Sequence, residues 1–236
     1  MLAFREDYND KEWPDNFINN WRKPDEENHS NLLHLHEFVK GLTIKGKYLE
    51  IGSGPSPIGI FSASTKFDDI TLSDFSVANI DRLKKWKSGG NLSNIMTLIE
   101  YVAKLEGRDV NQLMTISLSR VKNIRHADLL NDEILPKDDN KYSAISMNFV
   151  LLCACKTKED LFKAFTKLYN KLTPGGRLFD FGALNTNNYN VGGRLFSHCE
   201  IDLETLVVLA ERAGFKVLKQ EKLNMNTPCY CIVASR

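Results

Sequence analysis

Glycines and carboxylates stand at the ends of three apolar segments in the first half of this chain. The first segment leads into Gly52-Ser53-Gly54, the second ends at Asp74, and the third leads to Asp128. A glycine has no Cβ atom, so the backbone at such a turn can approach a ligand closely. A carboxylate at the end of the second strand can accept hydrogen bonds from both hydroxyls of a ribose. The spacing predicts one adenosine site, with Asp128 within reach of the adenine amino group.

The glycine loop does not match the dinucleotide-binding fingerprint G-x-G-x-x-G. The position of the third glycine holds Pro57. A ligand that carries a carboxylate and an ammonium group in place of a pyrophosphate needs no dense array of backbone amides. A later turn, Pro174-Gly175-Gly176, precedes a fifth apolar segment. The ordered set of motifs favours S-adenosyl-L-methionine over NAD as the cofactor, and a methyltransferase over a dehydrogenase.

Strand-like segments alternate with helical ones along most of the chain, which predicts βαβ units and a parallel sheet. We expect an α/β fold with a doubly wound, mostly parallel seven-stranded sheet and helices on both faces, in one domain that takes in residues 1–236. Residues 1–45 are expected to form a helical lid, broken at Pro14 and Pro24, before a core of residues 46–236. Residues 91–120 are predicted to be a helical insertion in that core. The strands are expected within residues 48–51, 70–74, 121–126, 142–152, 177–181, 215–220 and 228–234.

The balance of charges argues for a small-molecule substrate. Lys plus Arg (31) nearly equals Asp plus Glu (30), so no net positive field exists to attract nucleic acid or an anionic membrane. No apolar run approaches the ~20 residues that a membrane helix needs, and the N-terminus lacks a signal-peptide pattern. We therefore expect a cytoplasmic protein, and a monomer.

The five cysteines include two C-x-C pairs, Cys153/Cys155 and Cys229/Cys231. Both pairs stand in apolar, strand-like surroundings, where residues i and i+2 share a face but rarely form a disulfide. Structural zinc sites usually space their cysteines two to four residues apart in turns. Buried, reduced thiols are therefore expected, as is usual in the cytosol, and no metal site.

Several segments resemble the family of nicotinamide, phenylethanolamine, indolethylamine and thioether methyltransferases. In spaced form the resemblance spans almost the whole chain, including the helical preface and the insertion. It implies a class I, Rossmann-like methyltransferase that uses S-adenosyl-L-methionine and methylates the nitrogen of a small amine or pyridine-like heteroaromatic substrate. The segments are residues 49–55 (LEIGSGP), 67–75 (FDDITLSDF), 105–107 (LEG), 172–176 (LTPGG) and 182–185 (GALN), with Tyr189 and Gly192 after the last.

The resemblance also implies which residues contact the cofactor. Ordinary packing would suit Phe75 equally well, and the aromatic residues of the lid could equally be core anchors. The implied contacts are Gly52, Ser53, Gly54 and Asn148 for the methionine part, Asp74 and Asn79 for the ribose, Asp128, Leu129 and Phe75 for the adenine, and Tyr8, Trp13 and Phe17 for the lid.

The chain departs from the family pattern in the lid. Where relatives carry lid tyrosines, this sequence has Trp13 and Phe17, and the tyrosine expected shortly after Gly-Ser-Gly-Pro is Ile58. Each lost hydroxyl would remove a hydrogen bond to the methionine carboxylate, worth about 1 kcal/mol. Tyr8, Arg22 or another group could replace these contacts, or the cofactor could bind more weakly than in relatives.

The region after the fifth strand is expected to form the substrate wall. The acidic residue that relatives place near the substrate nitrogen is missing there, because Gly182 and Asn185 stand at its two candidate positions. Asp180 stands two residues earlier, deeper in the strand. We expect Asn185 as a polar contact, Tyr189 as an aromatic wall or hydroxyl contact, and His198 as a proton acceptor. The alternatives are that Tyr189 packs within a loop and that His198 is a surface histidine or one whose hydrogen bonds are satisfied within the protein.

The implied reaction needs positioning more than activation. A sulfonium methyl group is already a good electrophile, so the protein has to align a nitrogen lone pair and exclude water, with no obligatory base. Two other functions stay open. The departures above are compatible with a degenerate, non-catalytic cofactor binder, and nothing in the residues excludes an S- or O-methyltransferase of a small molecule.

Overall fold

The structure is a computed structural model that describes residues 2–236, without the side chains of residues 5 and 6. Its main sheet has seven strands in the order β3-β2-β1-β4-β5-β9-β8. β9 runs antiparallel to both neighbours, whereas the other pairs that involve β1 to β5 are parallel. This confirms the predicted doubly wound, mostly parallel sheet. The strands are β1 (Lys47–Ile51), β2 (Asp69–Asp74), β3 (Val121–His126), β4 (Tyr142–Asn148), β5 (Leu172–Ala183), β8 (Lys216–Leu223) and β9 (Cys229–Ser235).

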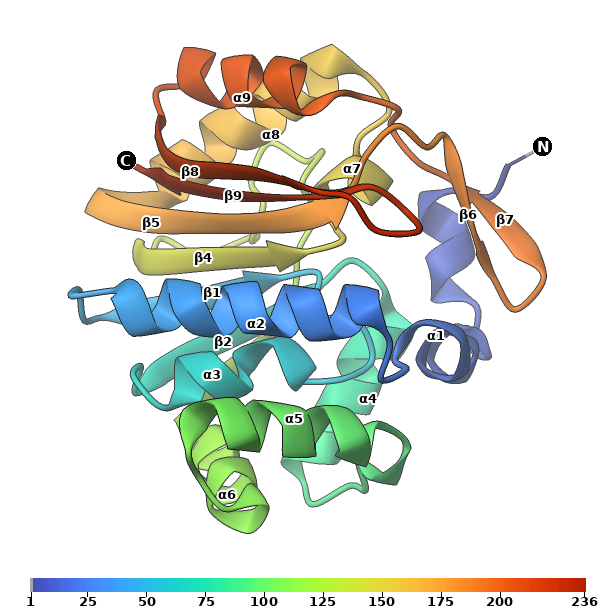
Figure 1. Cartoon of the computed structure of the whole chain (residues 1–236), viewed down its shortest axis with the longest axis vertical. Helices are drawn as coiled ribbons and strands as arrows, with labels where there is room; N and C mark the ends of the chain where they lie inside the picture. The colour runs from blue at the N-terminus through green and yellow to red at the C-terminus, as the bar shows by residue number, and fades with distance from the viewer. Residues whose placement is uncertain (1) are drawn as a thin grey trace.

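Helices cover both faces of this sheet (Figure 1). Alternate strand residues feed two separate cores, because successive side chains of a strand point to opposite faces. Tyr48 and Phe179 belong to one core, and their neighbours Leu49 and Leu178 to the other. The first core includes residues of α2 (Glu26–Gly41), α3 (Phe61–Ser64, after η2, Ile58–Ile60), α4 (Val77–Lys87), α5 (Met96–Glu106) and α6 (Val110–Arg120), and the second those of α7 (Leu151–Ala154), α8 (Lys158–Lys171) and α9 (Leu203–Arg212).

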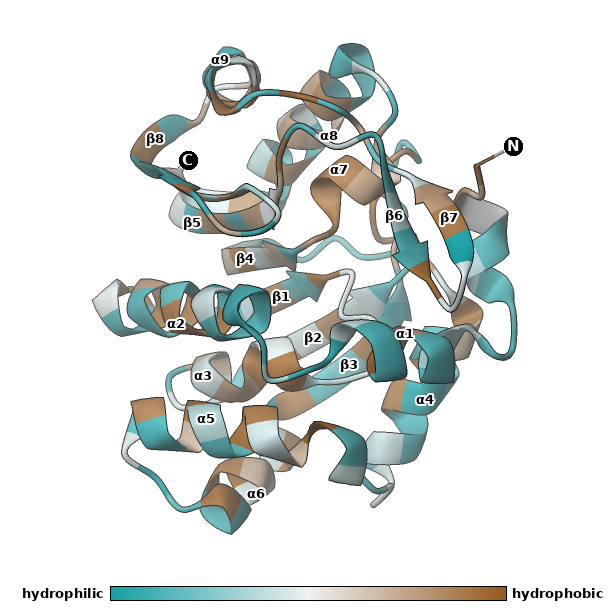
Figure 2. Ribbon diagram, turned by 45° about the vertical axis from the view of Figure 1, so that its right-hand side comes forward, coloured by the Kyte–Doolittle hydropathy of each residue, from teal (hydrophilic) through white to brown (hydrophobic). Residues whose placement is uncertain are grey.

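The hydropathy of the elements follows this layering. Figure 2 shows β1 and much of β4 as hydrophobic, whereas α2 alternates hydrophobic and hydrophilic residues. A central strand of a parallel sheet is buried on both faces, while a helix at the surface needs only one apolar stripe. Leu32, Leu35 and Phe38 supply that stripe in α2.

The predicted insertion of residues 91–120 is helical. It consists of η3 (Ser93–Ile95), α5 and α6. α5 packs on α2 and α6 packs on α3, so the insertion adds a further layer outside the helices of one face. Several polar contacts fasten it: for example, Ser64 Oγ lies 2.7 Å from Ser117 Oγ, and His36 Nδ1 lies 2.6 Å from Glu106 Oε1.

The N-terminal segment divides into two parts. η1 (Arg5–Asn9) and α1 (Trp13–Trp21) lie at the carboxyl ends of the strands, whereas α2 packs on the sheet. Pro14 stands in the first turn of α1, where a missing N–H costs nothing. The prediction that Pro14 breaks a helix is therefore wrong, because it helps to start one. The part of residues 1–45 that covers the strand ends is the part before α2.

A small hairpin packs against this N-terminal part and was not anticipated from the sequence. It pairs β6 (Asn188–Val191) with β7 (Arg194–Ser197) around the two-residue loop Gly192-Gly193. Ala3 extends it, because the Ala3 N–H donates to the Leu195 carbonyl at 2.9 Å. A Gly-Gly pair between two short runs is a recognised hairpin signal, so the sequence did contain the information.

The cysteines are free, and one of the two C-x-C pairs is not in a strand. Cys153 lies in α7 and Cys155 directly follows it, so the prediction of strand-like surroundings is wrong for this pair. Cys229 and Cys231 lie in β9, as expected. Within residues 2–236, no three His, Cys, Asp or Glu side chains gather in a way that could hold a metal ion. None of the helices in this range is long and apolar enough to cross a bilayer.

Candidate functional site

Two glycines with a left-handed backbone shape the turn after β1. Gly52 has φ +70° and Gly54 has φ +67°, angles that residues with a side chain rarely adopt. A Cβ atom on Gly52 would also lie 2.7 Å from Val150 Cγ1. The turn is fixed to the sheet because the Ser53 N–H donates to the Ser73 carbonyl at 2.9 Å. The loop backbone is thereby held at the carboxyl ends of the strands.

Asp74, the last residue of β2, is buried and held by three donors. Its Oδ2 accepts the Gly54 N–H at 2.7 Å, and its Oδ1 accepts the Ser76 N–H at 2.8 Å and Asn79 Nδ2 at 3.0 Å. Burial raises the pKa of Asp74, and these three hydrogen bonds oppose that rise. The carboxylate is therefore fixed in orientation, with acceptor capacity left for a ligand hydroxyl.

A cavity opens beside Asp74, with an empty volume of about 790 Å³ including its mouth. This size is typical of small-molecule sites. The structure brings eleven of the twelve predicted cofactor residues together here. The Ser53 side chain is buried and does not line the cavity. The predicted residues that do line it are Tyr8, Trp13, Phe17, Gly52, Gly54, Asp74, Phe75, Asn79, Asp128, Leu129 and Asn148.

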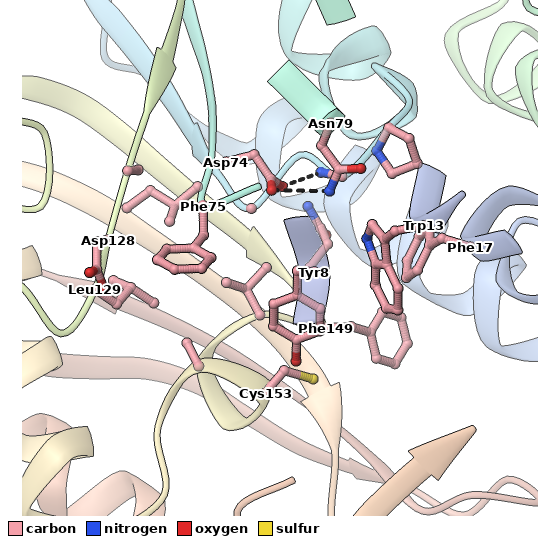
Figure 3. A pocket seen from close by; sticks show the side chains of 18 of the residues that line it. Tyr8, Trp13, Phe17, Asp74, Phe75, Asn79, Asp128, Leu129, Phe149 and Cys153 are labelled. Atoms are coloured by element: carbon pink, nitrogen blue, oxygen red, sulfur yellow. Dashed lines mark hydrogen bonds between the residues drawn. The ribbon is translucent and has the colours of Figure 1, made fainter. Parts of the chain in front are cut away.

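The two sides of this cavity differ in character. Figure 3 shows Phe75, Asp128 and Leu129 on one side, Trp13 and Phe17 on the other, and Asp74 between them. β3 ends at His126, so Asp128 lies in the loop that follows, where its Oδ1 accepts the Leu130 N–H at 2.9 Å. A flat aromatic side chain beside a carboxylate suits a purine base, and a fixed carboxylate such as that of Asp74 can accept hydrogen bonds from sugar hydroxyls.

Aromatic rings cover the cavity from the N-terminal side. Tyr8 stacks on Phe196 with ring centroids 5.2 Å apart, and Trp13 lies 4.7 Å from Phe196 and 5.6 Å from Phe17. The cover is tied to the sheet, because Ser76 Oγ donates to the Tyr8 carbonyl at 2.6 Å. The three predicted lid residues therefore form one packed unit with the hairpin, and the hydrogen bond from Ser76 helps to link that unit to the start of the helix that follows β2.

Arg22, directly after α1, lines the cavity. It was not among the twelve predicted cofactor contacts, and the sequence suggested it only as a possible replacement for the missing hydroxyls. It is 8% exposed and lines this cavity as well as the neighbouring one described below. Its Nη1 donates to Asn28 Oδ1 at 3.4 Å, and its Nε has no hydrogen-bond partner among the residues described. Burial lowers the pKa of Arg22, and the nearby Glu50 carboxylate raises it. A guanidinium held in this way has donors to offer a ligand.

Asn148, the last residue of β4, also borders both cavities. Its Oδ1 accepts Asn31 Nδ2 at 2.9 Å, and its Nδ2 donates to Glu50 Oε1 at 3.3 Å. Burial raises the pKa of Glu50 to about 7. These hydrogen bonds fix Asn148 at the junction of the two cavities. Its contact with the methionine part of the cofactor, implied by the resemblance, stays a prediction.

A second cavity adjoins the first and shares with it the side chains of Arg22, Asn148 and Tyr189. Tyr189 lies on β6, and its hydroxyl is 2.6 Å from that of Tyr8. Burial raises the pKa of both tyrosines, so both hydroxyls stay protonated at physiological pH. The two predicted residues Tyr189 and His198 line this second cavity. The joined cavities give one site with two compartments.

His198 is held neutral and in one tautomer. Burial lowers its pKa. Its Nδ1 lies 3.0 Å from the Thr186 carbonyl oxygen, which can only accept, so Nδ1 carries the proton. The lone pair is then on Nε2. Nε2 is therefore the ring atom that could accept a proton, and the role of His198 as proton acceptor stays a prediction.

The structure does not place Asn185 at either cavity. This residue leaves β5 with φ 54°, is exposed, and donates its N–H to the Ile201 carbonyl at 3.3 Å. Asp180 lies too deep, as its position in the strand indicated: it is fully buried and accepts the Tyr230 hydroxyl at 2.8 Å. Neither residue supplies a polar group to the compartment around Tyr189.

The carboxylate of the second cavity comes from the other end of the chain. Glu27, in the first turn of α2, is the acidic residue that lines this cavity among those the structure describes. Burial raises its pKa, while a hydrogen bond with Thr227 lowers it. No pattern in the sequence indicates this role, because Glu27 stands in a run of acidic residues that suits an exposed helix start.

A comparison with known sequences connects this geometry to a family. A profile of the NNMT/PNMT/TEMT family matches residues 2–234. The chain belongs to this family. Indolethylamine N-methyltransferase from Oryctolagus cuniculus is 30% identical over 196 residues, which cover 79% of this chain and 73% of that protein. Nicotinamide N-methyltransferase from Homo sapiens is 28% identical over 183 residues, which cover 74% and 68%.

Solved structures agree with the fold. The N-methyltransferase NodS from Bradyrhizobium japonicum WM9, in complex with S-adenosyl-L-homocysteine, superposes with a TM-score of 0.60 over 97% of this chain and 98% of that one. The sequence identity is 15%, so this likeness concerns the fold. The family and the fold predicted from the sequence are both confirmed.

The glycine loop and the strand-end carboxylates of this chain lie at the cavity, and aromatic rings of the N-terminal segment cover it. Trp13 and Phe17 occupy the cover as predicted, and neither has a hydroxyl. Ile58 is buried in the core of one sheet face and does not line the cavity. The polar groups on the cover side of the glycine loop include the Tyr8 hydroxyl and the Arg22 guanidinium.

Proposed function

We propose that this protein transfers the methyl group of S-adenosyl-L-methionine to the nitrogen of a small amine or pyridine-like molecule. The observation that carries the proposal is the pair of joined cavities. One is bordered by the glycine loop and Asp74, and the other is lined by aromatic rings and by a larger number of polar side chains. Membership of a family whose named relatives are N-methyltransferases supports it.

The residues of the first cavity fit the cofactor. Asp74 would accept the ribose hydroxyls, with Asn79 beside it, and Phe75, Asp128 and Leu129 would hold the adenine. A Cβ atom on Gly54 would point toward Phe17 and Arg22, at 3.7 and 4.0 Å, so the missing side chain leaves open the space that the methionine part needs. When bound, the cofactor supplies an electrophilic methyl carbon on a sulfonium.

The protein's own part in the reaction is to place the acceptor and keep water out. Tyr189 and Phe149 border both cavities, so a flat acceptor held against them would lie next to the first cavity. The paired hydroxyls of Tyr8 and Tyr189 close that wall. A pyridine-type nitrogen needs no base, and an aliphatic amine has to be neutral before it reacts. Holding the two reactants in contact replaces a bimolecular encounter.

Glu27 is the group that we assign to the acceptor nitrogen when the acceptor is an amine. Its carboxylate faces a cavity with Phe17, Trp21 and Phe149, and both a carboxylate and aromatic faces attract a cationic amine. The amine has to release a proton before attack, and His198 Nε2 is an acceptor in the same cavity. Glu27 thus takes the place of the acidic residue that the fifth strand lacks.

The direct test is methyl transfer from labelled S-adenosylmethionine to a panel of primary and secondary amines, pyridines, thiols, thioethers and alcohols, with products identified by mass. We expect label on nitrogen in at least one amine or pyridine. Transfer only to sulfur or oxygen would contradict the nitrogen acceptor. Binding of S-adenosylhomocysteine without any transfer would favour a non-catalytic relative.

We also propose that the protein acts as a monomer in the cytoplasm. All five cysteines are free, as is usual in a reducing compartment, and each cavity is complete within one chain. Light scattering on the purified protein would show one chain per particle, and cell fractionation would find it in the cytosol. A dimer, or recovery with membranes, would contradict this.

A further inference from the structure

Arg22 has more hydrogen-bonding capacity than its surroundings use. A guanidinium has five N–H donors. Within residues 2–236, the guanidinium makes one hydrogen bond, a long one from Nη1 to Asn28 Oδ1 at 3.4 Å. Its Nε has no acceptor among these residues. The side chain is 8% exposed, so water cannot satisfy the remaining donors freely. Buried polar groups normally find partners, and an exception needs an explanation.

The charge of Arg22 is also not matched by an ion pair. No carboxylate oxygen of the described residues lies within salt-bridge distance of it, although Glu50 and Asp25 act on its charge from farther away. Burial raises the pKa of Glu50 to about 7, so that group is only partly ionised at neutral pH. A buried cation without a close anion is unfavourable. The arrangement is suited to a ligand that brings a negative charge.

The position of Arg22 indicates which part of a ligand that is. Its Nη2 lies 4.0 Å from where a Cβ atom of Gly54 would be, on the cover side of the glycine loop. Phe75, Asp128 and Leu129 lie on the opposite side, and Asp74 between (Figure 3). If the adenine and ribose occupy those residues, the amino-acid end of the cofactor extends toward Gly54 and Arg22.

We propose that the Arg22 guanidinium binds the carboxylate of the cofactor's methionine part, and replaces the tyrosine hydroxyls that this chain lacks at Trp13, Phe17 and Ile58. The inference rests on the proposed function. An arginine and a carboxylate form one of the strongest side-chain contacts, because their hydrogen bonds are charge-assisted and can be bidentate. The carboxylate of an acceptor is the other possible source, since Arg22 lines both cavities.

The test compares two ligands on the full chain by calorimetry. One is S-adenosylhomocysteine, and the other is the same compound without its carboxylate, 5′-(3-aminopropylthio)adenosine. The wild type should bind S-adenosylhomocysteine about 10- to 100-fold more tightly than the decarboxylated compound, since a charge-assisted contact has that worth. In Arg22→Met this preference should fall to within about threefold, with the affinity for the decarboxylated compound unchanged. Arg22→Lys should keep part of the preference.

The matched control is Arg82→Met. Arg82 is an arginine of α4 that pairs with Asp15, outside both cavities. This variant should bind both ligands as the wild type does. The measured quantity is a ratio of affinities on one protein, so a general loss of stability does not imitate the effect.

Several results would overturn the inference. If the wild type binds both ligands equally well, the inference is overturned. This result needs no variant, so it decides the matter even if Arg22→Met fails to fold. An Arg22→Met protein that keeps the preference would also overturn the inference, and the proposed function would stand. If Arg22→Met instead raises KM only for acceptors that carry a carboxylate, Arg22 serves the acceptor. A wild type that binds neither ligand would contradict the proposed function itself.

Discussion

The backbone N–H of Gly54 donates to Oδ2 of Asp74 at 2.7 Å, across twenty residues of sequence. This bond joins the turn after β1 to the end of β2, the neighbouring strand. The loop and the carboxylate that we assign to the cofactor therefore position each other. A substitution of either residue should therefore alter the position of the other.

Substitution of Gly52 tests how tightly the loop is fixed. Gly52→Ala should lower the free energy of unfolding by about 1–3 kcal/mol, through its φ of +70° and overlap with Val150. It should also weaken cofactor binding, because the loop has to move. Adding Val150→Ala should recover part of the loss. Gly175→Ala is the control: its φ is +74° with no neighbour within 4 Å, so it should cost stability but leave cofactor affinity unchanged. Equal cofactor affinity in Gly52→Ala and the wild type would contradict the role of the loop.

The tyrosine pair should act as a unit. Tyr189→Phe leaves the Tyr8 hydroxyl without its 2.6 Å partner, and should lower stability by about 1–3 kcal/mol. Tyr8→Phe should cost a similar amount, and the double variant less than the sum of the two. A double-mutant cycle by denaturant unfolding measures this coupling. Additive losses would mean that the two hydroxyls do not interact.

Because burial raises the pKa of both tyrosines, cofactor affinity should show no phenol titration up to pH 10.

Glu27 should affect amine acceptors selectively. Glu27→Gln removes the negative charge at the second cavity, and should raise KM for a cationic amine by about 10-fold. A pyridine-type acceptor and the cofactor should be unaffected. Glu26→Gln is the matched control, since Glu26 is the exposed neighbour in the same helical turn. A similar change with both acceptor classes would show that Glu27 acts through the structure.

The buried carboxyl of Asp180 should make stability depend on pH. Burial raises the pKa of Asp180 to about 7, so the folded state holds a proton that the unfolded state releases above pH 4. Its contribution is present at low pH and is lost as the pH rises through 7. The wild type should therefore lose stability relative to Asp180→Asn between pH 5 and 8, by on the order of a few kcal/mol. Denaturant unfolding at several pH values measures the difference. Parallel pH profiles for the two proteins would contradict the raised pKa, and the exposed Asp139→Asn should leave the profile unchanged.

The parts of the site that follow strand ends could be predicted from the sequence. Gly52, Gly54 and Asp74 come directly after apolar runs, and parallel strands bring their carboxyl ends to one edge of the sheet. Phe75 directly follows β2, and Asn79 stands in the first turn of α4, the next element along the chain. In these cases local order along the chain is enough to bring the residues together.

The parts that depend on long-range packing could not be predicted. Glu27 stands in a run of acidic residues at the start of α2, and only the packing of that helix end beside the strand ends places it at the second cavity. The sequence named Arg22 as one possible replacement for the missing hydroxyls, but only the packing of α1 shows that it is buried at the site. Asn185 has a residue type that suits ligand contact, but a left-handed turn at the end of β5 directs the chain elsewhere. Cys153 lies in a short helix because the chain turns sharply after β4, with Phe149 at φ 59°.

The central claim is that Asp74, the glycine loop and Asp128 hold one adenosyl group. The most direct test is calorimetry of S-adenosylhomocysteine with Asp74→Ala, beside Asp81→Ala, which removes an exposed carboxylate of α4. Loss of two charge-assisted hydrogen bonds predicts a Kd raised at least about 100-fold for Asp74→Ala and unchanged for Asp81→Ala. An Asp74→Ala protein that is folded and binds the ligand as tightly as the wild type would contradict the account.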